Sequence, residues 1–204
     1  MRGKGLEVRA FAKRHAGFSL TELVVALAVA MILMAVGLPM FLRAYHSYEL
    51  SIAATQMADI LRLARYEAIR ENTPVQCIIQ ASSSVPGSTS VWVDSIKNGT
   101  LDPTEKTFLL GPSGSLVDGG GVPGTGGLIG TVVGSYGVNA PSPTGSGIWF
   151  DARGAVQQPA NVVNVFYLSS TLAPEAGYRA VFLMPAGSIQ IWTADISGNW
   201  QQQR

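Results

Sequence analysis

The hydrophobic residues are concentrated in one uncharged run near the start of the chain. Residues Leu23 to Leu42 include no charged side chain. About 20 apolar residues in a helix cross the ~30 Å hydrocarbon core of a bilayer. The run therefore predicts the membrane-spanning half of a helix, which we place at residues 18–42. Pro39 lies late in the run, where an interior proline usually kinks a helix.

An amphipathic pattern continues the helix beyond the apolar run. Thr73 precedes Pro74, and a residue before proline disfavours the α region, so the helix should end near Glu71. We expect residues 43–73 to be the exposed amphipathic half of one long helix, with its apolar stripe packed under a sheet. The stripe consists of Ala53, Met57, Ile60, Leu61, Ala64, Ala68 and Ile69.

After Pro74 the hydrophobic period changes to that of strands. Short segments rich in β-branched and aromatic residues alternate with turn residues such as Asn98-Gly99. Strands that follow one long helix indicate an α+β fold with an antiparallel sheet, here residues 74–204. The expected strands are Val75–Gln80, Ser90–Ser95, Lys106–Leu110, Gly147–Asp151, Val162–Leu168, Tyr178–Met184 and Ser188–Thr193.

A glycine-rich segment, residues 111–147, interrupts the strand pattern. Its composition favours flexible or loop structure, with short strands at Leu128–Val133 and Ser135–Val138. No Lys-Ser/Thr pair follows its glycines, as it would in a phosphate-binding loop. We therefore predict no function for this insert.

The charges divide unequally along the chain. The 204 residues are 47% hydrophobic and 13% charged, with a net charge of +1. A leader, residues 1–17, holds five basic residues and one acidic residue, so the rest of the chain is net negative. Basic residues before a span keep that end in the cytoplasm, and the C-terminal bulk should be translocated. The low charged fraction excludes a disordered charged tail protein.

A secretory signal peptide is the main alternative for this N-terminus. Its apolar region is usually ~7–15 residues long and ends at a small-residue cleavage site. Here the run is longer and continues into Arg43 without such a site. Glu22 directly precedes the run, where a carboxylate is costly and therefore indicates a function. An ordinary signal anchor with a chance glutamate remains the other interpretation.

The sequence GFSLTEL, residues 17–23, resembles the processing site of type IV prepilins and type II secretion pseudopilins. The resemblance implies that a prepilin peptidase cuts between Gly17 and Phe18 and methylates the new N-terminus at Phe18. It also implies that Glu22 pairs with the N-terminal amine of a neighbouring subunit. A carboxylate in lipid strongly prefers a hydrogen-bonded cation to isolation, which fits that role.

Further stretches resemble the GspH/FimT family of pseudopilins and minor pilins. They correspond to the family's helix end, first hairpin and C-terminal strands. The resemblance covers residues 17–110 and 147–193 and implies a type IV pilin-like fold, in which a long N-terminal transmembrane helix packs on an antiparallel β-sheet domain. The similar stretches are residues 65–75, 92–102, 148–154, 178–181 and 185–192.

The same resemblance implies a structural, non-enzymatic minor subunit of a type II secretion pseudopilus that supports protein secretion. The alternative is a FimT-like minor pilin of a type IV pilus that contributes to DNA uptake. In both cases the leader is cytoplasmic, the helix lies in the inner membrane and the globular domain is extracytoplasmic. The implied partners are other pilin or pseudopilin subunits, prepilin peptidase, the inner-membrane assembly platform, membrane lipid, and secreted cargo or DNA.

Other candidate chemistry is sparse, and we predict no catalytic residue, cofactor or metal. His15 and His46 both lie outside residues 74–204, so that domain offers no histidine for a nucleophilic triad. The single Cys77 sits in an apolar strand pattern, which indicates a buried, inert thiol. Calcium in an oxygen-rich loop stays an alternative, although the spacing misses the EF-hand pattern. That loop contains Asp94, Asn98, Gly99, Asp102 and Glu105.

DNA binding would require exposed cations near the C-terminal strands. The candidates are Arg153, Arg179 and Arg204. A net negative mature chain is a poor electrostatic start for phosphate binding. Three dispersed arginines are, moreover, often solvated or paired, so we rank DNA binding below assembly.

Overall fold

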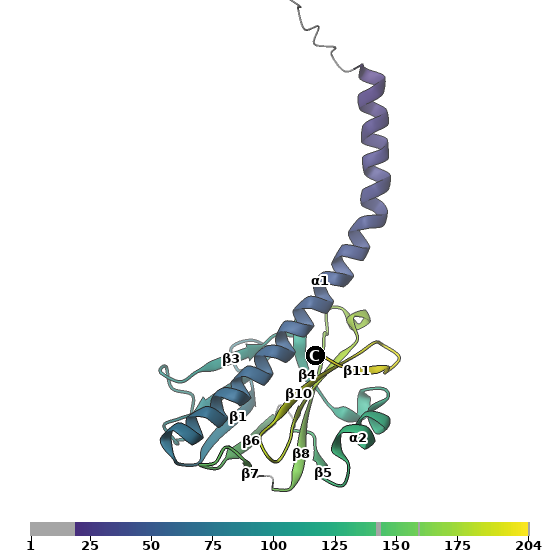
Figure 1. Cartoon of the computed structure of the whole chain (residues 1–204). Helices are drawn as coiled ribbons and strands as arrows, with labels where there is room; N and C mark the ends of the chain where they lie inside the picture. The colour runs from purple at the N-terminus through teal and green to yellow at the C-terminus, as the bar shows by residue number, and fades with distance from the viewer. Residues whose placement is uncertain (1–18, 142–143, 159, 204) are drawn as a thin grey trace, which may run out of the picture. The chain divides into compact units, whose positions relative to one another are not determined.

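The computed structural model describes residues 19–141, 144–158 and 160–203, and Figure 1 shows one long helix followed by a β-rich domain. The chain divides into two compact units between Met40 and Phe41. The helix α1 (Leu20–Glu71) is continuous through Pro39. It therefore contributes residues to both units, and each unit is described by itself.

The end of α1 confirms the prediction from Pro74. The helix ends at Glu71, and Asn72 takes a left-handed backbone with φ of 53°. The Thr73 amide then donates to the Ala68 carbonyl at 3.2 Å, a bond that is typical of a closed helix C-terminus. The chain thus leaves the helix in a defined direction and enters the first strand.

The second half of α1 buries the predicted apolar stripe, with one exception. Ile69, in the last turn of the helix, is 47% exposed. The expectation that Ile69 belongs to the buried face is therefore wrong. The buried helix residues are Leu50, Ala53, Ala54, Met57, Ala58, Ile60, Leu61, Ala64 and Ala68.

Two sheets replace the single sheet that the sequence predicts. The first is antiparallel throughout, in the order β3-β2-β1-β6-β7. Its strands are β1 (Val75–Ala81), β2 (Thr89–Asp94), β3 (Thr107–Leu110), β6 (Thr144–Phe150) and β7 (Val156–Gln158).

The second sheet has the order β11-β10-β9-β8-β4, and β5 adds a parallel pairing to β8. The glycine-rich segment supplies both β4 and β5. The predicted short strand over Ser135–Val138 overlaps β5, whereas the sequence analysis predicts no strand at β4. The strands are β4 (Ser115–Val117), β5 (Gly137–Asn139), β8 (Val162–Ser169), β9 (Tyr178–Leu183), β10 (Ile189–Ala194) and β11 (Trp200–Gln202).

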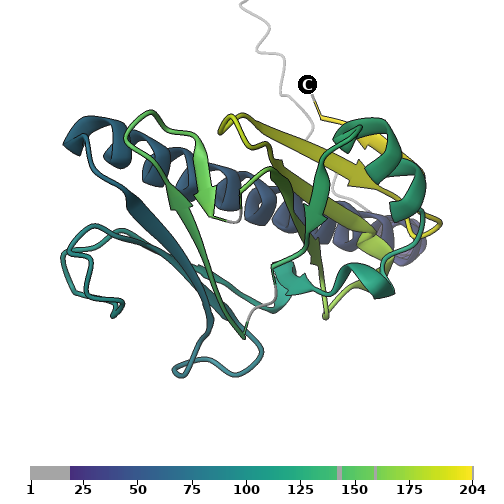
Figure 2. The ribbon, with the colours of Figure 1, turned by 90° about the horizontal axis from the view of Figure 1, so that it is seen from below.

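The second half of α1 covers one face of both sheets (Figure 2). Alternate residues of each strand point to this helix, because successive side chains of a strand point to opposite faces of the sheet. The strands β8 and β9 contribute to the same core, which makes helix and sheets one hydrophobic unit. The strand residues of this first core include Val75, Cys77, Ile79, Val91, Val93, Phe166, Leu168, Val181 and Leu183.

A second core lies on the opposite face of β8 and β9. The helix α2 (Thr125–Val133), which the glycine-rich segment forms, covers this face with Leu128 and Val133. The predicted strand over Leu128–Val133 is therefore wrong. Apolar residues at positions 128, 129, 132 and 133 follow helical spacing, but the intervening glycines hide this period. The sheet side of this core consists of Val163, Val165, Tyr167, Ala180 and Phe182.

Candidate processing and assembly site

A serine begins α1 directly beside the predicted processing site. Ser19 Oγ accepts the Glu22 amide at 3.2 Å, and the Leu23 amide donates to the Ser19 carbonyl at 3.2 Å. Ser19 is therefore the N-cap, and it satisfies amides that a free helix end leaves unpaired. Gly17 and Phe18, the predicted cleavage pair, lie outside the described residues.

Glu22 is exposed in the first turn of α1. Its position three residues after Ser19 is that of the acidic member of a capping box. A negative charge here is also favoured by the helix dipole. The site therefore presents a carboxylate at the helix start, one turn away from the predicted new N-terminus.

The helix surface that follows is apolar on all sides. Residues Leu23–Leu42 are exposed without exception. Within the part of the chain that the structure describes, α1 is the one helix long and apolar enough to span a membrane. A helix that is hydrophobic all round needs lipid or neighbouring helices as its surroundings.

Arg179 binds the second half of α1 and does not point to solvent. Its Nε donates to Ser51 Oγ at 3.1 Å, and its Nη2 donates to Ser47 Oγ at 2.9 Å. Its Nη1 donates to the carbonyls of Tyr178 and Ala176 at 2.9 and 3.4 Å. Sequence reasoning missed this contact, although an arginine in the otherwise apolar strand YRAVFL required internal acceptors.

The electrostatics of Arg179 follow from this position. The residue is 6% exposed, and burial lowers the pKa of its guanidinium. Within the described residues its hydrogen-bond partners are all neutral oxygens, which the planar fork can reach simultaneously. These bonds argue against Arg179 as a phosphate ligand.

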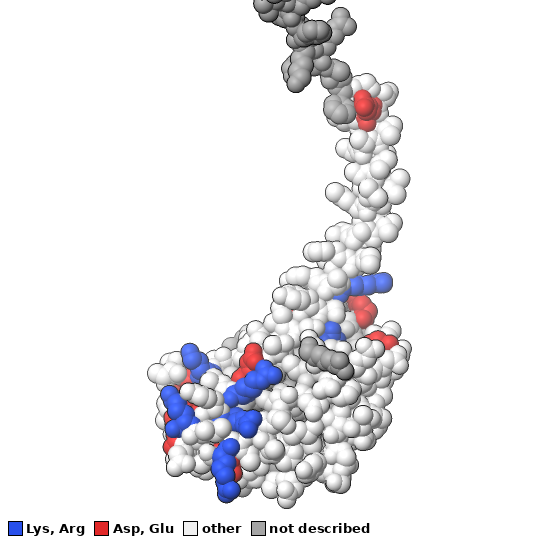
Figure 3. Space-filling model, in the orientation of Figure 1, with Lys and Arg blue, Asp and Glu red and all other residues white. Residues whose placement is uncertain are grey.

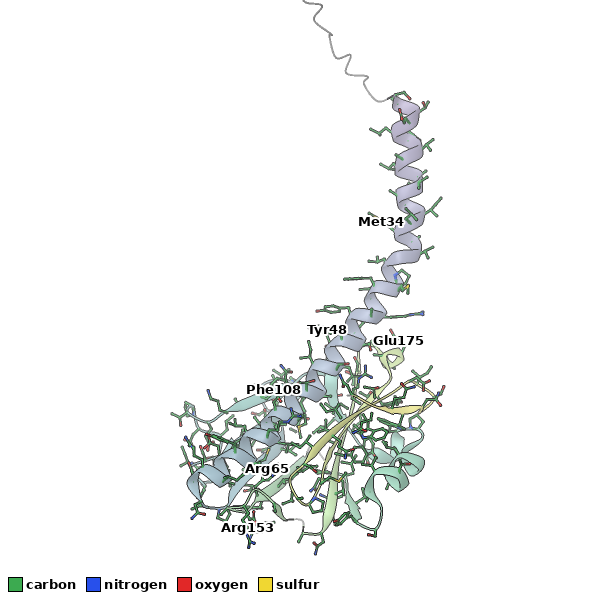
Figure 4. All side chains as sticks on the ribbon, viewed as in Figure 1. Met34, Tyr48, Arg65, Phe108, Arg153 and Glu175 are labelled. Atoms are coloured by element: carbon green, nitrogen blue, oxygen red, sulfur yellow. The ribbon has the colours of Figure 1, made fainter. Side chains whose placement is uncertain are left out.

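The other two candidates for DNA binding do not join Arg179. Arg153 is exposed in a tight turn, where Asp151 Oδ1 accepts the Arg153 amide at 2.9 Å. That turn packs on α1 at Arg65. This position is 14 to 18 residues, and therefore ~21–27 Å, along the helix from the two serines that Arg179 binds. Figure 4 shows Arg65 and Arg153 at the same end of the domain. Arg204 is outside the residues that the structure covers.

The oxygen-rich loop is organised by its own backbone. Asp94 accepts the amides of Lys97 at 2.6 Å and of Gly99 at 2.8 Å. Glu105 accepts the Ile96 amide at 3.2 Å and the Asp102 amide at 3.1 Å. A calcium ion would have to displace these donors from the two carboxylates.

The remaining reactive groups have structural surroundings. Cys77 is fully buried, and burial raises the pKa of its thiol to about 12. His46 Nδ1 lies 3.3 Å from Glu49 Oε2, three residues further along α1. Among the described residues, no group of three metal-ligating side chains could hold a metal ion.

Comparisons with known proteins agree with this arrangement. The family described as "Type II transport protein GspH" matches residues 53–187, which is more than half of the chain. The "Prokaryotic N-terminal methylation motif" matches residues 12–38. No curated protein matches the sequence significantly.

Two crystal structures of the type IV minor pilin FimU from Pseudomonas aeruginosa are among the solved structures similar to this chain. They are 16% and 15% identical to this chain, with a TM-score of 0.46 each. The alignments cover 77% and 76% of this chain, and 94% and 98% of the FimU chains.

The family match and the methylation motif confirm the predicted GspH/FimT-type resemblance. They indicate a membrane-anchored pilin-type protein whose globular part lies outside the cytoplasm and which assembles with other pilin subunits. The chain therefore belongs to the GspH family and carries the prokaryotic N-terminal methylation motif at the start of its apolar helix.

Proposed function

We propose that this protein is a structural minor pseudopilin of a type II secretion system, and not an enzyme. The observation that carries the proposal is Glu22 in the capped first turn of a helix whose next 20 residues are uncharged and exposed. A membrane anchor alone needs the apolar surface but not the carboxylate. The name of the matching family, a type II transport protein, supports secretion as the process.

The proposed sequence of events begins with a leader, residues 1–17, in the cytoplasm. Prepilin peptidase cuts between Gly17 and Phe18 and methylates Phe18. The inner-membrane assembly platform then moves the subunit out of the bilayer. Residues 18–42 leave lipid for the helices of neighbouring subunits, with which they make van der Waals contacts. Residues 43–73 and the domain 74–204 contact other subunits or secreted cargo.

Glu22 would direct this packing by charge. The methylated amine of Phe18 is a cation in a medium of low dielectric, so a neighbouring carboxylate is its best partner. An unpaired Glu22 would by contrast cost a few kcal/mol at the edge of a span. Pairing between subunits therefore favours one axial register over others.

Two measurements test this function. Mass spectrometry of the mature protein should find N-methylated Phe18 as its first residue; an intact leader in cells with active peptidase would refute the processing step. Glu22→Gln should leave insertion and cleavage unchanged but reduce filament assembly and secretion. Glu71→Gln, at the other end of α1, is the matched control and should assemble normally.

A type IV minor pilin that takes part in DNA uptake is the second candidate. The exposed side chain of Arg153 is the observation that favours it. Titration with duplex DNA at two salt concentrations distinguishes the two functions, because phosphate binding weakens steeply with salt. Salt-sensitive binding that Arg153→Gln abolishes would support DNA uptake.

A further inference from the structure

A groove runs between α2 and the β10–β11 hairpin, on the part of the domain that the glycine-rich insert builds. Its volume of about 460 Å³ lies in the range of small-ligand sites. We call it the α2–β11 groove. The side chains and backbone that form it include Gly127, Thr131, Trp192, Asn199, Trp200 and Gln201.

Two indole rings are fixed in the wall of this groove. Trp200 Nε1 donates to the Pro123 carbonyl at 3.1 Å, and Trp192 Nε1 donates to Gln190 Oε1 at 3.2 Å. From the core side, Phe182 meets the ring of Trp192 edge to face, with centroids 6.4 Å apart. Both indoles remain partly exposed. Rigid indoles of this kind offer contact area at little cost in conformational entropy.

Close backbone contact holds the two sides of the groove together. Gly124 and Gly198 both have positive φ, and a Cβ on Gly198 would lie 2.6 Å from the Pro123 backbone. In the adjacent turn, Asn199 Nδ2 donates to Asp195 Oδ2 at 2.7 Å, and the Asn199 backbone amide donates to Asp195 Oδ1 at 3.0 Å. The groove is therefore a built feature of the fold, in which Asp195 already orients the Asn199 side chain.

Among the described residues, no charged side chain lines the α2–β11 groove. On the face of the molecule that Figure 3 shows, the area over α2 likewise has no blue or red atoms. Among the lining residues the single aliphatic side chain is Leu128, which is 4% exposed and belongs to the second core. The lining that the structure describes thus offers indole surface, amides and one hydroxyl, but neither a charged side chain nor an aliphatic pocket.

We propose that the α2–β11 groove binds a neutral oligosaccharide. The apolar C–H faces of a sugar ring match the exposed indoles, and its hydroxyls match the amides of Asn199 and Gln201 and the hydroxyl of Thr131. Among the described lining residues, a charged glycan would find no counter-ion, and a protein partner would find no pocket for an apolar anchor side chain. This inference concerns the insert and is independent of filament assembly.

Two glycines of α2 provide a matched test. Gly127 lines the groove and Gly126 does not, and a Cβ at either position would meet no atom within 4 Å. Leucine has a higher helix propensity than glycine, so neither substitution should weaken α2. Gly127→Leu should therefore fill the groove and Gly126→Leu should leave it open, while both variants stay folded.

The experiment uses the full chain in a detergent without a sugar headgroup. Calorimetric titration with tetramers of β-1,4-linked N-acetylglucosamine, β-1,4-linked glucose and α-1,4-linked glucose should detect binding of at least one. Gly127→Leu should weaken that binding at least tenfold, and Gly126→Leu by less than twofold. The proposal is overturned if none of the three binds, or if both variants bind as the parent does. A change of oligomeric state in Gly127→Leu without sugar binding would instead identify the groove as a protein interface.

Discussion

Arg179 Nη2 donates to the Ser47 carbonyl at 3.2 Å and to Ser47 Oγ at 2.9 Å, although the two residues are 132 positions apart. The contact joins β9 to the second half of α1. Ser51 Oγ takes part in it, since it accepts from Arg179 Nε and donates to the Ser47 carbonyl at 2.9 Å. One guanidinium thus fixes where the helix lies along the second sheet.

Arg179→Lys should lower the free energy of unfolding by ~1–3 kcal/mol. An ammonium has three donors without the planar fork, so some of the acceptors around it lose their bond inside the protein. Chemical denaturation of the full chain in detergent measures the change. Arg153→Lys, in an exposed turn, is the control and should stay within ~0.5 kcal/mol. Equal effects of the two variants would contradict the role of the Arg179 contact.

Gly198→Ala should destabilise the protein more than Gly87→Ala. Both glycines have positive φ, 81° at Gly198 and 76° at Gly87, so an alanine is strained at either site. The Gly198 variant would in addition push against the Pro123 backbone, whereas Gly87 has open space. We expect ~1 kcal/mol at Gly87 and at least ~2 kcal/mol at Gly198, from strain plus overpacking. Thermal unfolding of both variants provides the measurement.

Much of this fold could be predicted from the period of the hydrophobic residues. The end of α1 and the central strands β1, β8 and β9 agree with the predicted ranges within a few residues. The strands β8 and β9 are nearly continuous apolar runs because both their faces are buried, one under α1 and one under α2. These continuous apolar runs were the sequence signal that a second layer covers the other face of the sheet.

The insert and the arginine contact could not be predicted in the same way. Glycine carries no side chain, so the period of α2 rests on four apolar residues among three glycines. The short strands β7 and β11 are defined by pairing with neighbours and not by their own composition. For Arg179, an arginine in a strand is compatible with solvent, DNA or an internal acceptor, and only the packing of α1 distinguishes them.

Ser19→Ala should loosen the first turn of α1. Loss of an N-cap costs ~1 kcal/mol, which corresponds to a roughly fivefold rise in local opening. Hydrogen exchange at the Glu22 amide, which Ser19 Oγ accepts, should accelerate by that factor. Ser19→Asn retains a capping oxygen and should exchange at close to the parental rate. Unchanged exchange in Ser19→Ala would show that the cap contributes little.

The buried thiol of Cys77 should make stability depend on alkaline pH. Burial raises the pKa of Cys77 to about 12, against ~8.5 for an unfolded cysteine. The unfolded state therefore loses this proton first, and stability falls as pH rises from ~8.5 towards 12. The thiol should also resist alkylation at pH 8 until the protein is denatured, because the thiolate is the reactive form.

Cys77→Ala separates this effect from simple packing. Removal of the buried sulfur costs stability at every pH, but the variant lacks the titrating group. The free energy of unfolding of Cys77→Ala is lower than that of the parent, and this difference should therefore shrink by ~2 kcal/mol between pH 7 and pH 10. Burial also raises the pKa of Tyr167 to about 12, so Tyr167→Phe should change the pH dependence only above ~10. Denaturant unfolding at pH 7, 9, 10 and 11 measures both variants, and a constant deficit for Cys77→Ala would contradict the burial of the thiol.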